Sequence, residues 1–198
     1  MSGNERGKRD KMGRVLESAK QVFLRYGYRR TTMGDLAGAA EMSRPALYLL
    51  YANKEEIFRA VIENYCEQSE CLAAQRVADA GSLEERLASL MLTWVVEPYE
   101  EISKSPEAGE IYEAGYAFAE DLHRRFSETY TAQIEAVLQA SEEVDEQRVR
   151  AAGFSIRRVA EMLASSSLGL KREVRERGLL LPLLEDMRRW YLGAMIVR

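Results

Sequence analysis

The sequence is poor in the side chains on which most enzymes and metal sites depend. Its 198 residues include one histidine, His123, and two cysteines, Cys66 and Cys71. Structural zinc sites mostly need four sulfur or nitrogen ligands, so these three residues make a weak set and we expect no metal. The sequence also lacks a glycine-rich phosphate loop and a nucleophile elbow. We therefore expect a protein that is not an enzyme and that uses no cofactor.

Long hydrophobic runs are absent as well. No stretch approaches the ~20 consecutive apolar residues that a membrane helix needs. Residues 1–14 are polar and basic, without the apolar region of a secretory signal. A disulfide between Cys66 and Cys71 is not expected, because their spacing separates them by about 140° around a helix. These features predict a cytoplasmic protein without membrane contact.

The formal net charge of −4 conceals an uneven distribution along the chain. Residues 1–53 contain ten Lys or Arg and five Asp or Glu, a net +5, whereas residues 54–198 contain eighteen and twenty-seven, a net −9. A basic end attracts a polyanion and an acidic body does not. Chance also produces imbalances of this size, so the charge supports nucleic-acid binding only together with a motif.

Apolar residues recur at three- and four-residue steps through almost the whole chain, which predicts helices. No useful run alternates apolar and polar residues as strands do. The expected fold is all-α, with a helix-turn-helix domain of three helices over residues 1–54 and a larger helical body over residues 55–198. The expected helices are 11–26, ending at Gly27, then 33–40, 44–50, 54–78, 82–97, 110–141, 145–176 and 179–197, with a loop or broken helix at 98–109.

Residues 27–58 predict two short helices joined by a tight turn. Ser43 can cap the second helix, and Pro45 is tolerated in its first turn, where a missing N–H has no helical partner. Arg44 and Tyr48 lie one turn apart on what should be the outer face. A helix of about seven residues is about 10 Å long and fits a major groove about 12 Å wide. The pattern predicts that Arg44 reaches guanine O6 and N7 with Tyr48 beside it.

Further polar and aromatic residues surround this short helix where DNA phosphates would pass. Phosphate contacts position a protein on DNA, and base contacts give specificity. A helical scaffold that never binds DNA remains an alternative, since alanine-rich helix pairs with short turns occur in many proteins. The surrounding residues are Thr31, Thr32, Tyr51 and Lys54.

About thirty residues carry a dense set of matches to one known pattern: Gly27-Tyr28, Thr31-Thr32-Met33, Leu36-Ala37, Ala40, Met42-Ser43, Pro45, Leu47-Tyr48, Tyr51 and Asn53-Lys54-Glu55. The stretch resembles the DNA-binding module of TetR-family (tetracycline-repressor-type) transcription regulators. The resemblance implies a homodimer that binds a palindromic double-stranded operator, and a C-terminal domain whose small-molecule ligand releases the DNA. Repression is the commoner outcome in that family. Carried over position by position, the DNA-facing set is Thr32, Arg44, Pro45, Tyr48, Tyr51 and Lys54.

Two departures from the family pattern concern the same module. Glu41 stands in the turn where the family usually has glycine, and a left-handed backbone there would cost roughly 1–2 kcal/mol. Leu49 and Leu50 stand where polar or aromatic groups are frequent, so fewer direct base contacts are expected than usual.

Aromatic residues are concentrated in the helical body. Each can be an ordinary core residue, or together they can line an apolar pocket with a few polar tips. The resemblance favours a pocket for an apolar or aromatic effector. The candidate lining residues are Met91, Trp94, Tyr112, Tyr116, Phe126 and Tyr130.

The last two predicted helices carry small and apolar residues that permit close approach of a second copy. A two-fold, four-helix contact would place two recognition helices on one side, about 34–36 Å or a multiple apart. The candidate dimer residues are Met162, Ser165, Leu168, Gly169, Trp190, Tyr191 and Met195.

A thiol-sensing DNA-binding regulator that uses Cys66 or Cys71 is the alternative to a small-molecule sensor.

Overall fold

The computed structural model describes residues 3–174, 176 and 178–196. Apart from an isolated antiparallel bridge between Val144 and Ile196, regular structure in this part of the chain is helical, so the all-α prediction is confirmed. None of the described helices is both long and apolar enough to cross a membrane. The elements are α1 (Gly3–Arg30), α2 (Met33–Ala39), α3 (Arg44–Tyr48), α4 (Lys54–Asp79), α5 (Leu83–Met91), η1 (Leu92–Val96), α6 (Glu97–Ser103), α7 (Ala108–Phe118), α8 (Glu120–Gln139), α9 (Glu146–Ala151), α10 (Ile156–Glu173) and α11 (Leu180–Met195).

Contacts divide the chain into two compact units. Unit 1 consists of Met1–Glu67 and Ile102–His123, and unit 2 consists of Gln68–Glu101 and Arg124–Arg198. The predicted boundary after residue 54 separates the expected DNA-binding domain from the expected ligand-binding and dimerisation domain. The two units are defined by contacts alone, so this boundary stays a prediction.

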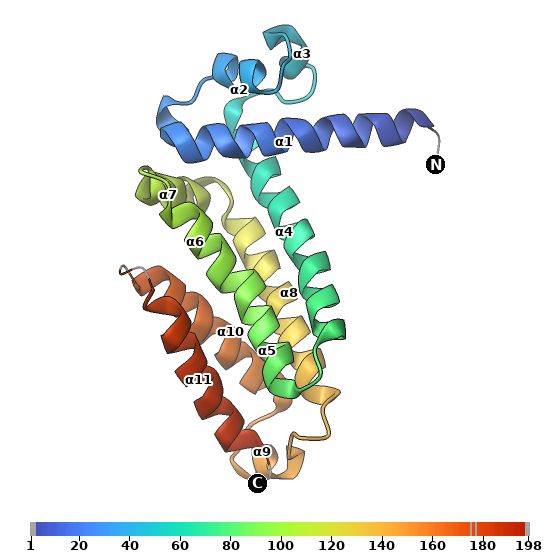
Figure 1. Ribbon diagram of the computed structural model, residues 1–198, viewed down its shortest axis with the longest axis vertical. Coiled ribbons are helices and arrows are strands. Elements are labelled where there is room, and N and C mark those ends of the chain that lie inside the picture. The colour runs from blue at the N-terminus through green and yellow to red at the C-terminus, as the bar shows by residue number, and fades with distance from the viewer. Residues whose placement is uncertain (1–2, 175, 177, 197–198) are drawn as a thin grey trace. The chain divides into compact units, whose positions relative to one another are not determined.

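Unit 1 holds the expected helix-turn-helix on a single apolar core (Figure 1). Helix α1 packs against α2 and α7, and α2 packs against α3. Tyr28 lies at the centre of an aromatic cluster, with its ring centroid 5.0 Å from that of Phe58 and 4.9 Å from that of Phe118. Leu47 of α3 and Ile57 of α4 are fully buried in the same core. The packing of Leu47 therefore stabilises the short helix α3, since an isolated helix of this length would not be stable in water.

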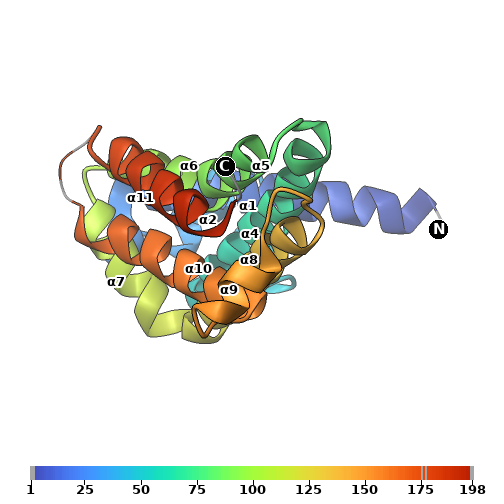
Figure 2. The ribbon, with the colours of Figure 1, turned by 90° about the horizontal axis from the view of Figure 1, so that it is seen from below.

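Unit 2 is a helical bundle in which α11 packs against α5, α9 and α10, and α10 also packs against η1. Figure 2 shows α10 and α11 running side by side. Ser82 begins α5 with a capping box, because its side chain accepts from Glu85 N and the Glu85 carboxylate accepts from Ser82 N at 3.0 Å. Leu87, Leu163 and Leu184 supply fully buried side chains to the core of this unit.

Two boundaries of the predicted helices are wrong for reasons that the structure supplies. Helix does not end before Pro98: it continues as α6 to Ser103 after the π-helical turn η1. A proline ring collides with the carbonyl of the residue four before it, here Trp94, and the wider turn relieves that collision. The predicted single helix over 110–141 is divided at Ala119, where φ is −139°. At this break Arg59 Nη1 donates a hydrogen bond to the carbonyl oxygen of Phe118.

The predicted helix over 145–176 is also divided. Gly153, with φ at +85°, ends the short helix α9, and Ser155 caps α10 by accepting a hydrogen bond from Arg158 N. Both residues were visible signals in the sequence, since glycine supplies left-handed backbone and serine caps helices. Helix α10 ends at Glu173, three residues before the predicted end at 176. The predicted end of the last helix, at residue 197, lies outside the described part of the chain.

Candidate nucleic-acid interface

The first short helix, α2, begins with a complete capping box. Thr32 Oγ1 accepts a hydrogen bond from Asp35 N at 3.2 Å, and the Asp35 carboxylate accepts from Thr32 N at 2.8 Å. The hydroxyl of Thr32 also donates to Asp35 at 2.7 Å, and these hydrogen bonds lower the pKa of the Asp35 carboxyl. The start of the helix-turn-helix is therefore fixed by Thr32 of the predicted motif together with Asp35, three residues later.

The turn between α2 and α3 is a Schellman-type C-cap with glutamate in the position that glycine usually holds. Met42 N donates to Ala37 O at 2.9 Å, and Glu41 N donates to Gly38 O at 3.1 Å. Glu41 has φ at +54°, and it is the only described residue other than glycine with positive φ. The chain therefore keeps the left-handed turn rather than reshaping it, at a cost of about 1 kcal/mol.

Ser43 begins α3 as predicted, with its Oγ accepting from Ala46 N at 3.3 Å and Pro45 in the first turn. Arg44 is exposed, and its guanidinium carbon lies 5.8 Å from the centre of the Tyr48 ring, which is 45% exposed. Thr32 and Pro45 are exposed as well. Four of the seven predicted DNA-facing residues are therefore exposed at or near α3. The Arg44 guanidinium lies over the Tyr48 ring, in the geometry of a cation–π contact.

The other three predicted DNA-facing residues have structural roles that the sequence did not reveal. Thr31 is 2% exposed, and its hydroxyl donates to Gly27 O at 2.6 Å. Tyr51 is 8% exposed, and its buried hydroxyl has no hydrogen-bond partner in the described chain. Burial raises the pKa of Tyr51. We therefore leave the side chains of Thr31 and Tyr51 out of the set that we propose for DNA.

Lys54 is occupied by the end of α1. Its Nζ donates to the carbonyl oxygens of Tyr28 at 2.8 Å, Thr31 at 2.9 Å and Arg29 at 3.1 Å, and lies 4.5 Å from the centre of the Tyr28 ring. An ammonium group has three hydrogens to donate, so these contacts satisfy it completely. Lys54 therefore holds the chain between α1 and α2, and we leave it out of the phosphate-binding set too.

The C-terminal end of α1 is also tied to α7, within unit 1, by contacts that no sequence pattern predicted. Gly27 has φ at +76°, which turns the chain so that Arg29 N donates to the Glu110 carboxylate. Arg30 pairs with Glu107. A Cβ at position 27 would lie 2.9 Å from Glu110 Oε1, a side-chain tip that could shift, so glycine is favoured there mainly by the positive φ. Gly27 interrupts the helix, as predicted, but it does so as a kink within Gly3–Arg30 and not as the end of α1, and its contact with α7 depends on the tertiary structure.

The residues predicted to line a ligand pocket fall in different units. Met91, Trp94, Phe126 and Tyr130 are buried in unit 2, where the Trp94 ring centre lies 6.5 Å from Phe126 and 6.0 Å from Tyr130. The polar tips of this cluster are used: Trp94 Nε1 donates to Gln133 Oε1 at 2.7 Å, and the Tyr130 hydroxyl lies 3.2 Å from Ser167 Oγ.

The two remaining pocket candidates belong to unit 1. Tyr112 is half-buried, and Tyr116 is 39% exposed and stacks on His123 at 5.2 Å between ring centres. Unit 2 thus contains four of the six candidates, and three of these form its aromatic cluster.

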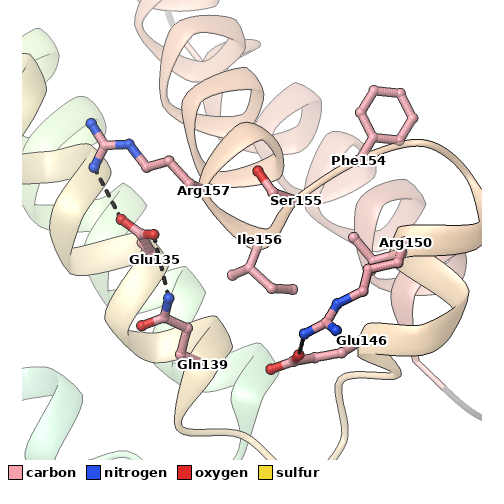
Figure 3. A pocket seen from close by; sticks show the side chains of 9 residues that line it. Glu135, Gln139, Glu146, Arg150, Phe154, Ser155, Ile156 and Arg157 are labelled. Carbon is pink, nitrogen blue, oxygen red and sulfur yellow. Dashed lines mark hydrogen bonds and ion pairs between the residues drawn. The ribbon is translucent and has the colours of Figure 1, made fainter.

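A separate pocket of about 460 Å³ lies in unit 2 between α8, α9 and the start of α10 (Figure 3). Arg157 pairs with Glu135 at 3.0 Å, and Arg150 pairs with Glu146 at 2.6 Å, so opposite charges face one another around it. None of the six predicted pocket residues is among its lining residues, which are Glu135, Gln139, Glu146, Val149, Arg150, Phe154, Ser155, Ile156 and Arg157.

The predicted dimer residues lie on α10 and α11 with unequal exposure. Trp190 is 69% exposed and Ser165 is exposed, whereas Tyr191 and Met195 are buried within unit 2. The other three, Met162, Leu168 and Gly169, are half-buried. Trp190 is therefore the exposed large apolar side chain among the seven candidates.

The thiols and the histidine form no site in the described residues. Cys66 is half-buried and Cys71 is exposed, and the described residues contain no disulfide between them. No group of three potential metal-binding side chains occurs in the part of the chain that was searched. A thiol-sensing role stays a prediction without structural support.

Comparison with known proteins identifies the N-terminal region. Residues 15–61 match the model of "Bacterial regulatory proteins, tetR family". The chain is 35% identical over 75 residues to the HTH-type transcriptional repressor ComR of Escherichia coli (strain K12), a match that covers 37% of this chain and 36% of that protein. It is 33% identical over 69 residues to the HTH-type transcriptional activator FasR of Mycolicibacterium smegmatis, covering 33% of this chain and 32% of that protein. The chain thus spans about a third of the length of the curated relatives it matches.

Solved structures show a similar fold over nearly the whole chain. A TetR/AcrR-family transcriptional regulator from Thermobifida fusca has a TM-score of 0.65 at 18% identity, over 93% of this chain and 97% of that one. A TetR transcription regulator from Haloarcula marismortui also has a TM-score of 0.65, at 19% identity, over 96% of this chain and all of that one. At such identities the likeness concerns the fold alone. Residues 15–61, which include the helix-turn-helix, therefore match the tetR family of bacterial regulatory proteins, and the chain as a whole shares the fold of TetR-type regulators.

Proposed function

We propose that this protein is a ligand-responsive transcriptional regulator, a repressor that binds a palindromic operator as a homodimer. The observation that carries the proposal is the outer face of α3, where Arg44, Pro45 and Tyr48 are exposed on a helix that is anchored from behind by buried Leu47. Thr32, at the start of α2, adds an exposed hydroxyl that we expect to face the DNA phosphates. The net +5 of residues 1–53 supplies attraction to DNA that the acidic remainder lacks.

The dimer belongs to the proposal because one helix as short as α3 reads few base pairs. Two copies related by a two-fold axis would read a palindrome with half-sites about one helical turn apart. Helices α10 and α11, with Trp190 exposed, offer the surface for that contact. Repression is proposed because ComR is named a repressor, although FasR is named an activator.

The effector is proposed to be a small apolar or aromatic molecule that enters the cluster of Trp94, Phe126 and Tyr130. These side chains combine large apolar surfaces with an indole N–H and a phenol, a composition typical of ligand sites. A ligand that binds better to the state unable to bind DNA weakens operator binding by its differential affinity, about 5- to 150-fold for typical couplings.

The DNA proposal is tested by selecting bound sequences from random duplexes and measuring affinity for the selected site against salt concentration. We expect a palindromic site, and a fall in affinity of about 10³–10⁵ between about 50 and 200 mM salt if six to ten phosphates are contacted. Binding without an enriched sequence, or no binding to duplex, would reject the regulator and favour a helical scaffold.

The effector proposal is tested with a panel of aromatic compounds screened for an increase in melting temperature. Each compound that stabilises the protein is then added to the operator complex, with a Trp94→Ala variant as control. We expect stabilising compounds to lower operator affinity in the native protein and to have little effect in the variant. Stabilisation with unchanged operator affinity would reject ligand release. Release that needs thiol alkylation and is lost in Cys66→Ser or Cys71→Ser would favour the thiol sensor instead.

A further inference from the structure

The outer face of α3 is divided into a polar and an apolar strip. Arg44 and Tyr48 are four residues apart, and so are Pro45 and Leu49, which places each pair along one side of the helix. All four residues are exposed. The first pair presents a guanidinium stacked on a phenol ring, 5.8 Å from its centre. The second pair presents only the carbon atoms of its side chains, so the helix offers two different chemistries to whatever it meets.

Leu49 is held in this exposed position by its neighbours. At 87% exposure, it is the most exposed large hydrophobic side chain in the described chain. Its backbone is nevertheless helical, with φ at −72° and ψ at −18°, and its N–H donates to Pro45 O at 3.2 Å. Leu47 is fully buried and Leu50 packs against the same core, so the chain on both sides of Leu49 is anchored.

We propose that Leu49 is a specificity-determining residue that contacts the 5-methyl group of a thymine in each half-site. The inference rests on the proposed function, since it assigns a base to the face of α3 that would enter the major groove. Thymine alone among the four bases carries a methyl group on its major-groove edge, and the other edges offer mainly polar atoms. An aliphatic side chain gains from contact with that methyl and gains nothing comparable from phosphate. Pro45, one turn earlier, extends the apolar strip.

The test uses the operator selected from random duplexes and replaces each thymine, one at a time, with deoxyuridine. This substitution removes the methyl group and leaves the base pair and its hydrogen bonds intact. For the native protein we expect one thymine per half-site at which affinity falls about fourfold, the value of one buried carbon. Replacing a cytosine elsewhere in the site with 5-methylcytosine controls for general effects of a methyl group.

The variant Leu49→Asn has nearly the same size and cannot make the apolar contact. We expect it to bind the thymine and deoxyuridine operators equally, while Leu49→Met keeps the preference for thymine. Leu72→Asn, which changes an exposed leucine in a different helix, α4, should retain the native preference. Because Leu49 and Leu72 are both exposed, circular dichroism should show that all three variants fold normally.

The outcomes separate this inference from the proposed function. A selected half-site without thymine, native affinity that is indifferent to every deoxyuridine, or the same methyl preference in Leu49→Asn would overturn the role of Leu49 and leave DNA binding in place. Failure to select any site would reject the proposed function itself.

Discussion

Arg59 and Asp121 form a two-pronged ion pair between α4 and the start of α8, within unit 1. Nη1 lies 2.8 Å from Oδ1 and Nη2 lies 2.7 Å from Oδ2, and Nη1 also donates to Phe118 O. Planar guanidinium and carboxylate groups match in this geometry. The pair fixes the chain at the break between α7 and α8, where the sequence predicted an uninterrupted helix.

This ion pair predicts the titration of Asp121. Hydrogen bonding to Arg59 lowers its pKa from 3.8 to about 2. Because the pKa is lowered on folding, the pair stabilises the folded state above about pH 4, and that stabilisation disappears as the pH falls toward 2. Carboxyl carbon shifts measured by NMR should show the low pKa in the native protein and a higher pKa in Arg59→Gln. Arg59→Lys, which keeps the charge without the paired geometry, should fall between them; equal values in all three would contradict the pair.

The left-handed backbone of Glu41 predicts a stabilising substitution. Glu41→Gly should raise the free energy of unfolding by about 1 kcal/mol, since glycine adopts positive φ without the clash of a Cβ. Glu41→Ala removes the charge and keeps the clash, so urea denaturation should find it no more stable than the native protein. Equal stabilisation by both substitutions would assign the effect to the carboxylate and not to the backbone.

The three hydrogen bonds of Lys54 predict a loss of stability that is independent of DNA. Lys54→Met keeps most of the aliphatic stem and leaves three carbonyl oxygens at the end of α1 without their donor, so we expect a loss of about 2–3 kcal/mol by urea denaturation. Lys104→Met, at an exposed lysine of the same unit, should change stability by less than about 0.5 kcal/mol. A Lys54→Met protein of native stability that binds DNA with a smaller salt dependence would instead restore Lys54 to the phosphate-binding set.

The exposed guanidinium of Arg44 predicts a loss of base discrimination. Arg44→Ala should weaken binding to the selected operator by about 1–3 kcal/mol and relax the preference at one base pair of each half-site. Competition between operators with single changes at that pair measures the effect. A uniform weakening across all sequences would mean that Arg44 contacts phosphate and not guanine.

The exposure of Trp190 predicts a disruptive substitution in the proposed dimer. Trp190→Arg should shift the sedimentation of the protein from dimer to monomer, because a charge would replace a large apolar surface at the centre of the contact. Leu72→Arg, at a partly exposed leucine of α4, provides the matched control and should leave the mass unchanged. A native protein that sediments as a monomer, or a Trp190→Arg protein that remains dimeric, would exclude this surface.

The sequence by itself determined the helical character of the chain, the turn at Gly27, the cap at Ser43 and the face of α3, because each depends on residues within one turn of one another. Only the tertiary structure decided that Lys54 serves the end of α1, since its partners Tyr28 and Arg29 become its neighbours only when the chain folds back. The same holds for the break at Ala119, where a guanidinium about sixty residues earlier in the chain satisfies the carbonyl of Phe118 that the interruption of the helix leaves free. Local hydrogen bonds can be read from spacing, whereas a donor from a distant helix can be assigned only when the packing of that helix is known.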